Sequence, residues 1–297
     1  MFYDAQACRE RLKNTTPMVL IDKAQKISDT QFAGYKCVTQ NELFFIGHFP
    51  EHPIMPGVLQ IEAMKQLAQL FLADRFGGAM QIVKLSRVKF RNPVSPGARM
   101  KISLEITEET AENITAKAKV EIALGVASEA TLTFGAMQTA DTGSSIPEFN
   151  EFDLNNEVAL NHQDTMSLMP HRFPFLLIDY VAKNDGETVV GVKNVSINEP
   201  IFANMTDPVM PISLLCEIAA QSGCACVLSR PENEGKLGYF MSIDQAEALA
   251  PVRPGDQLLI NFSLPQGKSR FGKGSGFMTV NGKKVFTITL TFALVDK

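Results

Sequence analysis

Three common features are missing from this sequence, and each absence excludes a class of protein. There is no basic excess, because 28 Lys and Arg against 32 Asp and Glu give a formal net charge of −4. Proteins that bind nucleic acid generally are usually basic, so we expect no nucleic-acid partner. No stretch is apolar for long enough to span a bilayer, and the first eleven residues carry charges where a signal peptide needs an apolar run. We therefore expect a cytoplasmic protein without a membrane span.

Cysteines at ligand spacing are also missing. The five cysteines are odd in number, include no CxxC pair and have no His partners at the spacing of metal ligands. Reduced thiols in the cytoplasm are the simplest account, and we expect no metal site. What the chain does have is 297 residues, of which 45% are hydrophobic and 20% charged. That composition is typical of globular proteins, and the length suffices for two domains, each with its own core.

Residues 47–69 are the most informative stretch. Prolines at positions 50, 53 and 56 fix the backbone and remove donors, so the stretch begins as a stiff loop, neither helix nor central strand. Pro56-Gly57 then opens a helix that is apolar nearly all round, which predicts that it is buried. His48 on the loop, the N–H of Gly57 at the helix N-terminus and the carboxylate of Glu62 together indicate acid–base chemistry. Taken singly, they are more typical of a core helix with a stray Glu and a loop His.

This stretch resembles the signature of the 3-hydroxyacyl-acyl carrier protein dehydratases of the FabZ type, which have the hot-dog fold. That signature reads roughly H-F-P-x-H-P-x-M-P-G-x-x-x-x-E-A-x-x-Q. It is matched here by His48-Phe49-Pro50, His52-Pro53, Met55-Pro56-Gly57, Glu62-Ala63 and Gln66. The family's second signature, L-P-H-R-x-P-F-L-L-[IV]-D, normally stands near the start of the domain. Here it occurs at residues 169–179, where a second copy of the domain would begin.

An internal repeat accounts for that position. Glu62 and Gln66 align with Glu217 and Gln221, and residues 54–56 align with 209–211. Further matches, residues 93–97 with 251–255 and 132–134 with 290–292, preserve the order at a shift of 155 to 158 residues. We interpret this as a tandem duplication. It predicts domains at 1–140 and 153–297, joined by a small, polar, breaker-rich linker at 141–152.

Each copy predicts one long buried helix and many strands. Apolar strands are expected at 18–21 and 175–178, and alternating, β-branched strands at 101–106 and 285–292. One helix with many strands predicts an α+β fold in which an antiparallel sheet curls around the helix. The resemblance implies the same arrangement twice, a double hot-dog. Hot-dog dehydratases of this kind are generally homodimers with shared active sites, and a tandem chain would make that dimer by itself.

The two copies differ at the residues that would carry the chemistry. The positions of His48, Gly57 and Glu62 are taken in the second copy by Ala203, Ile212 and Glu217. In the family, one subunit supplies the catalytic His and the Gly whose N–H binds the thioester carbonyl, and the other supplies the carboxylate. The resemblance therefore implies one complete site, formed by His48, Gly57 and Glu217. It also implies one degenerate site, formed by Ala203, Ile212 and Glu62. For either Glu, a relic carboxylate bonded within a closed pocket is the alternative.

Supporting roles are suggested by helix spacing and by the motifs. Gln66 and Gln221 lie one turn after each Glu and share its face, so we expect Gln221 to orient Glu217. His171, in the second signature, is expected to be structural or near the pocket entrance rather than catalytic. The residues expected to support the loop are His52, Pro56 and Met55.

The reaction implied by the resemblance is the reversible loss of water from a 3-hydroxyacyl thioester, giving the trans-2-enoyl thioester. Neutral His48 would take the C2 proton. Glu217, its pKa raised by burial, would protonate or orient the leaving hydroxyl. The N–H of Gly57 would stabilise the developing enolate at the thioester oxygen. No metal or redox cofactor is needed.

The acyl donor implied by the resemblance is acyl carrier protein, which is acidic. The basic side chains that could receive it are Lys84, Arg87, Lys89 and Arg91, or Lys268, Arg270 and Lys273. Charged strand residues are usually just a solvated face.

Coenzyme A as the carrier, isomerase activity, chain length and pathway stay open. So do two other functions: a hot-dog thioesterase, and a non-catalytic acyl-binding or scaffold partner in a fatty-acid or polyketide assembly. A duplicated chain can also form a homo-oligomer to cover its sheet edges.

Overall fold

The computed structural model describes residues 1–16, 18–137, 157–265 and 271–296. The predicted linker at 141–152 lies outside these ranges. The first copy contains, in chain order, β1 (Phe2–Tyr3), α1 (Ala5–Arg11), η1 (Lys13–Thr15), β2 (Lys23–Lys26), β3 (Gln31–Cys37), η2 (Leu43–Ile46), α2 (Gly57–Leu72), η3 (Ala73–Phe76), β4 (Met80–Phe90), β5 (Arg99–Glu109), β6 (Asn113–Ile122) and β7 (Gly125–Ala136). The second contains α3 (His162–Leu168), β8 (Tyr180–Asn184), β9 (Thr188–Asn194), η5 (Pro200–Phe202), α4 (Ile212–Leu228), η6 (Pro231–Asn233), β10 (Lys236–Ala248), β11 (Gln257–Ser263), β12 (Phe271–Val280) and β13 (Lys283–Asp296). None of these described helices is both long and apolar enough to cross a membrane.

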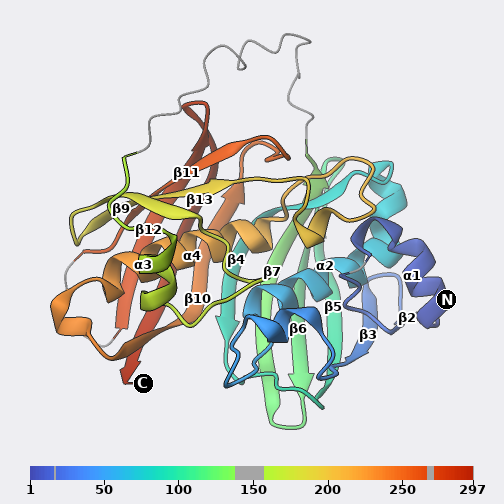
Figure 1. The fold of residues 1–297 in the computed structure, drawn as a ribbon. Helices are drawn as coiled ribbons and strands as arrows, with labels where there is room; N and C mark the ends of the chain where they lie inside the picture. The colour runs from blue at the N-terminus through green and yellow to red at the C-terminus, as the bar shows by residue number, and fades with distance from the viewer. Residues whose placement is uncertain (17, 138–156, 266–270, 297) are drawn as a thin grey trace.

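The strands join into one antiparallel sheet, in the order β1-β2-β3-β5-β6-β7-β4-β10-β13-β12-β11-β9-β8. At its centre β4 pairs with β10, with Lys89 opposite Ser242 and Lys84 opposite Glu247. Outward from that pair the two copies repeat the same sequence of strands, so the sheet has a pseudo-twofold axis between β4 and β10 (Figure 1). The predicted double hot-dog of α+β class is confirmed.

The two long helices, α2 and α4, form the centre of the core. Each begins directly after a proline, α2 at Gly57 as predicted and α4 at Ile212. Each packs against the strands of its own half, and the two helices also contact each other (Figure 1). The burial predicted from the apolar pattern is confirmed, and it extends to the polar residues Glu62, Lys65 and Gln66 of α2. Buried polar groups need partners inside the core, and for these three residues the partners come from both copies of the domain.

Two apolar segments that were predicted as strands join no strand of the sheet. Each is held instead by the glutamine of the long helix in its own half. Gln66 accepts a hydrogen bond from the N–H of Leu20 at 2.7 Å and donates one to the carbonyl of Met18 at 2.8 Å. Gln221 makes the same pair of bonds to the second segment. A side-chain amide carries a donor and an acceptor, as a backbone peptide does, so it can replace a neighbouring strand. The two segments are residues 18–21 and 175–178.

Replacing Gln66 with Leu should lower the free energy of unfolding by about 2–6 kcal/mol. The change leaves an N–H and a carbonyl of the core without partners, at roughly 1–3 kcal/mol each. Urea unfolding of the variant and the wild type measures the difference. Gln163→Leu, at an exposed position of α3, is the control and should change stability by less than about 0.5 kcal/mol. Equal losses in both variants would show that the two bonds of Gln66 contribute nothing specific.

Candidate functional site

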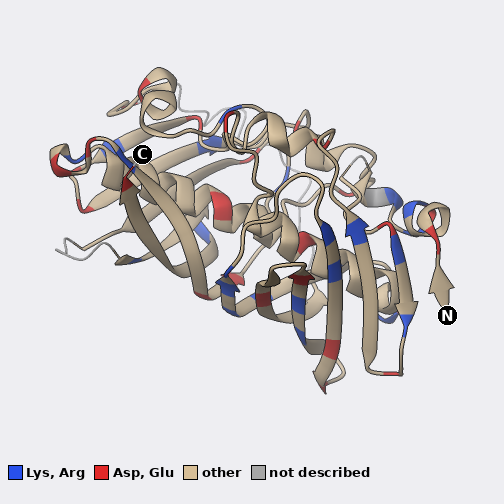
Figure 2. Ribbon diagram, turned by 90° about the horizontal axis from the view of Figure 1, so that it is seen from below, with Lys and Arg blue, Asp and Glu red and all other residues tan. Residues whose placement is uncertain are grey.

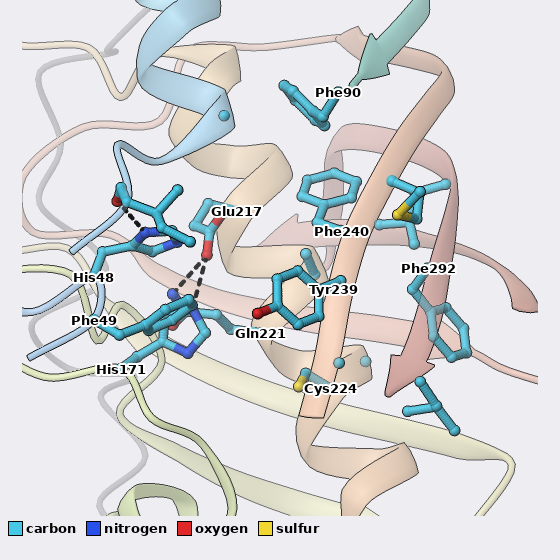
Figure 3. A pocket seen from close by; sticks show the side chains of 18 of the residues that line it. His48, Phe49, Phe90, His171, Glu217, Gln221, Cys224, Tyr239, Phe240 and Phe292 are labelled. Carbon is cyan, nitrogen blue, oxygen red and sulfur yellow. Dashed lines mark hydrogen bonds and ion pairs between the residues drawn. The ribbon is translucent and has the colours of Figure 1, made fainter. Parts of the chain in front are cut away.

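A cavity of about 340 Å³ lies where the two halves meet. Its walls come from the proline loop, α2 and β4 of the first copy and from α4, β10, β11 and β13 of the second. The walls are mostly apolar, with Phe90, Phe240, Phe262 and Phe292 among them (Figure 3). Five of the predicted site residues line this one cavity: His48, Met55, Gly57, Glu217 and Gln221.

His48 is fixed by the proline loop. Its Nδ1–H donates to the carbonyl of Ile54 at 2.7 Å, so the lone pair of the neutral ring is on Nε2. The ring stacks on Phe49, with the two centroids 4.2 Å apart. Burial and the nearby His171 lower the pKa of His48 to about 4, although Glu217 opposes the shift. At neutral pH the ring is therefore uncharged, and its Nε2 can accept a proton.

Glu217 reaches the same cavity from α4, in the other half. Its Oε1 accepts a hydrogen bond from Nε2 of Gln221 at 2.9 Å and lies 3.5 Å from Nε2 of His171 (Figure 3). Burial raises the pKa of Glu217, but the bond and charge of His171, the charge of His48 and the Gln221 bond outweigh it, and the pKa lies below its ordinary value. The expectation that burial keeps this carboxyl protonated is therefore wrong. Its neighbours supply hydrogen-bond donors that favour the carboxylate.

His171 lies inside the cavity, beside the two groups just described. It is only 7% exposed, and its ring centroid is 5.5 Å from that of His48. Its sequence motif predicts a residue that is structural or near the pocket entrance rather than catalytic. The two motifs meet where the N–H of Arg172 donates to the carbonyl of Gly47 at 3.0 Å. A Cβ at Gly47 would lie 2.0 Å from the carbonyl oxygen of Arg172, so only glycine permits this approach.

Gly57 is the first residue of α2, where a backbone N–H has no acceptor within the helix. A Cβ at this position would lie 2.6 Å from the ring of Phe90 in β4, so the glycine leaves room for that ring. In the second copy the corresponding positions hold Ile212 and Ala248. The large side chain thus belongs to the strand in the first copy, Phe90, and to the helix in the second, Ile212. The helix N-terminus is open to the cavity in the first copy, while Ile212 is buried.

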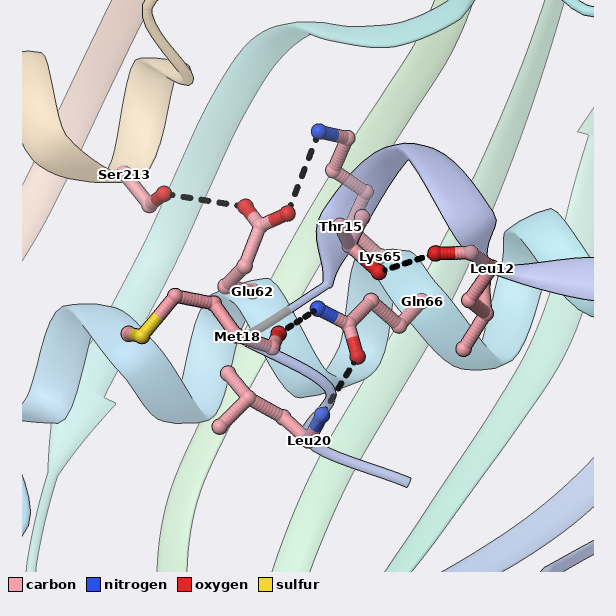
Figure 4. Close-up of polar contacts among 8 residues, drawn as sticks. All are labelled: Leu12, Thr15, Met18, Leu20, Glu62, Lys65, Gln66 and Ser213. Carbon is pink, nitrogen blue, oxygen red and sulfur yellow. Dashed lines mark hydrogen bonds and ion pairs between the residues drawn. The ribbon is translucent and has the colours of Figure 1, made fainter. Parts of the chain in front are cut away.

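Glu62, at the position equivalent to Glu217, occupies a very different environment. Nζ of Lys65 donates to its Oε1 at 3.1 Å, and the hydroxyl of Ser213 donates to its Oε2 at 3.1 Å (Figure 4). Glu62 is 1% exposed and Lys65 is 3% exposed. The residue equivalent to Lys65 is Ala220, which lines the cavity of the other site. A lysine side chain therefore closes the predicted degenerate site, and its ammonium pairs with the carboxylate.

The remaining predicted residues lie around these two sites. His52 is exposed and away from the cavity, and its backbone closes the turn of the loop. Pro56 is buried and caps α2, and the N–H of Met55 donates to the carbonyl of Val94 at 2.8 Å. Ala203 follows the short helix η5 in the second copy. The described residues thus place His48, Gly57 and Glu217 around one cavity. Ile212 lies on the side of Glu62, whose partner Ser213 follows Ile212 directly.

Comparison with known proteins identifies the family of this chain. A model of the FabA-like domain matches the chain twice, at residues 12–128 and 169–289. The chain belongs to the FabA-like family. It is 42% identical over 141 residues to the 3-hydroxyacyl-[acyl-carrier-protein] dehydratase FabZ of Geobacillus thermodenitrificans, covering 46% of this chain and 97% of that protein. It is 43% identical over 138 residues to the FabZ of Halalkalibacterium halodurans, covering 46% of this chain and 99% of that protein.

Solved structures resemble the whole double fold of this FabA-like chain. The dehydratase domain from the CurJ module of Curacin polyketide synthase matches with a TM-score of 0.61 at 15% identity, over 93% of this chain and 97% of that one. An acyl-CoA thioesterase II, TesB2, from Mycobacterium marinum matches with a TM-score of 0.56 at 12% identity, over 92% and 96%. At such identities the likeness concerns the fold alone.

Replacing Lys65 with Met should lower the free energy of unfolding by about 3–5 kcal/mol, because it leaves the buried carboxylate of Glu62 without its partner. The double variant Glu62→Gln/Lys65→Met removes both charges and should recover most of that loss. Denaturant unfolding of the wild type, both single variants and the double variant forms a double-mutant cycle that measures the coupling. Additive effects, with no coupling energy, would contradict the ion pair.

Proposed function

We propose that this chain dehydrates 3-hydroxyacyl thioesters, carried by acyl carrier protein, to trans-2-enoyl thioesters in fatty-acid or polyketide synthesis. One observation carries the proposal: His48 and Gly57 of one copy line the same apolar cavity as Glu217 of the other. The 42% identity to a FabZ dehydratase, over 97% of that protein, supports the same reaction. There is one such site per chain, because the equivalent place beside Glu62 holds Lys65.

His48 is the base in this proposal. Its neutral Nε2 takes the proton from C2 of the substrate, and the electrons of that C–H bond form the enolate of the thioester. The enolate then forms the C2–C3 double bond as the C3–O bond breaks. Glu217 accepts the hydrogen bond of the 3-hydroxyl. As the carboxylate it then relays the proton taken by His48 to the departing oxygen, which leaves as water. The proton lost at C2 is the proton gained by the hydroxyl, so the enzyme ends in its starting state.

Gly57 stabilises the charge that develops in this step. Its N–H, at the positive end of the α2 dipole, binds the thioester oxygen as the enolate forms, at roughly 3–4 kcal/mol for such a donor. Phe90, Phe240 and Phe292 offer apolar surface to the acyl chain. His171 and Gln221 hold Glu217 in place through its Oε1.

The carrier partner is acidic, and basic side chains lie near the mouth of the cavity. Arg91 lines the cavity and is exposed, with one bond to Glu129 at 2.5 Å. Lys89 and Arg87 line a second groove. The strands of the first half carry both basic and acidic residues (Figure 2). We propose that acyl carrier protein docks near Arg91. Of the alternative basic residues, Lys268 and Arg270 lie outside the described ranges, and Lys273 pairs with Asp244. The five free thiols support a cytoplasmic location.

Thioester hydrolysis, the other hot-dog reaction, fits this site less well. It needs a carboxylate that activates water, and it gives no role to an imidazole whose tautomer is fixed by Ile54. A non-catalytic acyl-binding partner would need neither His48 nor Glu217 in the cavity. We therefore favour the dehydratase over both.

Glu217→Gln should reduce kcat/KM for a 3-hydroxyacyl carrier protein by about 10²–10⁴, because the variant has no group to relay the proton. Glu62→Gln should keep activity within about threefold of wild type, because its carboxylate faces Lys65 rather than the cavity. Absorbance of the enoyl thioester follows both reactions. The reverse dependence would place the reaction at Glu62, and an inactive wild type on either carrier protein or coenzyme A thioesters would favour the acyl-binding scaffold.

The pH profile should reflect the lowered pKa values of the site. His48 must be neutral to act as base, and its pKa of about 4 keeps it neutral down to roughly pH 5. The lowered pKa of Glu217 also keeps its carboxylate ionised in acid. Activity should therefore be lost as the pH falls toward 4, and kcat/KM for the dehydration measures this. Circular dichroism at each pH controls for unfolding, and half-loss near pH 6.5 in folded protein would contradict the assignment.

A further inference from the structure

The three side chains that meet in the cavity are also a set of metal ligands. One nitrogen each of His48 and His171 and one carboxylate oxygen of Glu217 lie within 4.8 Å of one another. Imidazole and carboxylate groups bind Zn²⁺ in proteins, and three such ligands leave a fourth position open for water. We propose that the cavity binds Zn²⁺ reversibly through His48, His171 and Glu217, and that bound zinc blocks catalysis.

The surroundings of His48 already have the form that a zinc ligand requires. Metal-bound imidazoles almost always donate their second ring N–H to a carbonyl, a carboxylate or water, which fixes the tautomer. Nδ1 of His48 makes such a bond to Ile54, at 2.7 Å, and leaves Nε2 free. Glu217 has the equivalent support, because Gln221 donates to its Oε1 at 2.9 Å.

His171 stands beside Glu217, in position to complete the set. Its Nε2 lies 3.5 Å from Oε1 of Glu217, close to the separation of about 3.4 Å expected for two ligands on one tetrahedral zinc. Its Nδ1 is buried and, among the described residues, has no hydrogen-bond partner. The ring can therefore turn toward a metal without breaking a bond at Nδ1. All the separations between the three ligand atoms lie within 4.8 Å.

Charge and space limit the binding to one zinc per chain. At the cavity, the carboxylate of Glu217 stands beside two imidazoles with no lysine or arginine bonded to it, which favours a divalent cation. At the equivalent place in the other half, Glu62 already holds the ammonium group of Lys65 at 3.1 Å. That cation repels a metal ion and takes up the carboxylate oxygen a metal would use.

Zinc binding and substrate turnover exclude each other in this arrangement. Nε2 of His48 is both the proposed base and the proposed ligand, so inhibition should be competitive with the acyl thioester. This inhibition rests on the proposed dehydratase function, whereas the binding itself does not. The test therefore measures binding and activity separately.

Binding is measured with Co²⁺, whose visible absorption reports imidazole and carboxylate coordination, followed by displacement with Zn²⁺ under a competing chelator. All proteins carry Cys37→Ser, which removes the exposed thiol. We expect one metal ion per chain, and no effect of Mg²⁺ or Ca²⁺, which prefer all-oxygen sites. His171→Asn should weaken zinc binding by at least about a hundredfold, since even outer-shell changes cost ten- to a hundredfold in affinity.

The matched control is the double variant His52→Ala/His162→Ala, which removes the other two of the four histidines, both exposed. It should bind one zinc with wild-type affinity and show the same zinc inhibition. Unchanged binding in His171→Asn, or loss of binding in the control, would overturn the site. Binding at the cavity without competitive inhibition would overturn the blocking effect alone. If the protein binds zinc as expected but turns over no acyl thioester, the metal site stands and the dehydratase proposal fails.

Discussion

The antiparallel pairing of β4 with β10 is the constraint on which the site depends. It places the two copies about a pseudo-twofold axis, so that α2 and α4 contact each other inside one continuous sheet. The start of α4 then contacts Glu62 through Ser213, and the start of α2 lines the same cavity as Glu217. Neither copy alone supplies all three groups, His48, Gly57 and Glu217, that line the cavity. The site exists only because the sheet is continuous through that pair.

The two buried glutamates show how neighbours decide the chemistry of a side chain. Both lie at the same helical position in their copies and both are almost fully buried. Glu217 has imidazole and amide donors around an open cavity, which keep it charged and accessible. Glu62 has an ammonium and a hydroxyl, which keep it paired and closed off. The helix motif itself is better preserved around Glu62, so motif quality alone points to the carboxylate that does not line the cavity.

Much of the fold and of the candidate site could be predicted from the sequence, because the informative signals were local or repeated. The start of α2 at Gly57, its burial and the duplication could be inferred from proline, periodicity and spacing. The partners of the buried polar groups could not be predicted in this way. Gln66 bonds Leu20 and Met18, which lie 46 and 48 residues away in the sequence, in place of a neighbouring strand. His171 reaches the cavity only because Gly47 allows a close backbone contact. The lowered pKa of Glu217 depends on the same long-range placement.

The closure of the second site by Lys65 also has an evolutionary consequence. Restoring a working centre there would require a new imidazole at Ala203, a glycine at Ile212 and the removal of Lys65. Removing Lys65 alone leaves the buried carboxylate of Glu62 without a partner. A glycine at Ile212 alone leaves a void facing Ala248. Each of these single substitutions would therefore lower stability before any activity could return. Single substitutions in the duplicated chain therefore oppose a return to two equal sites.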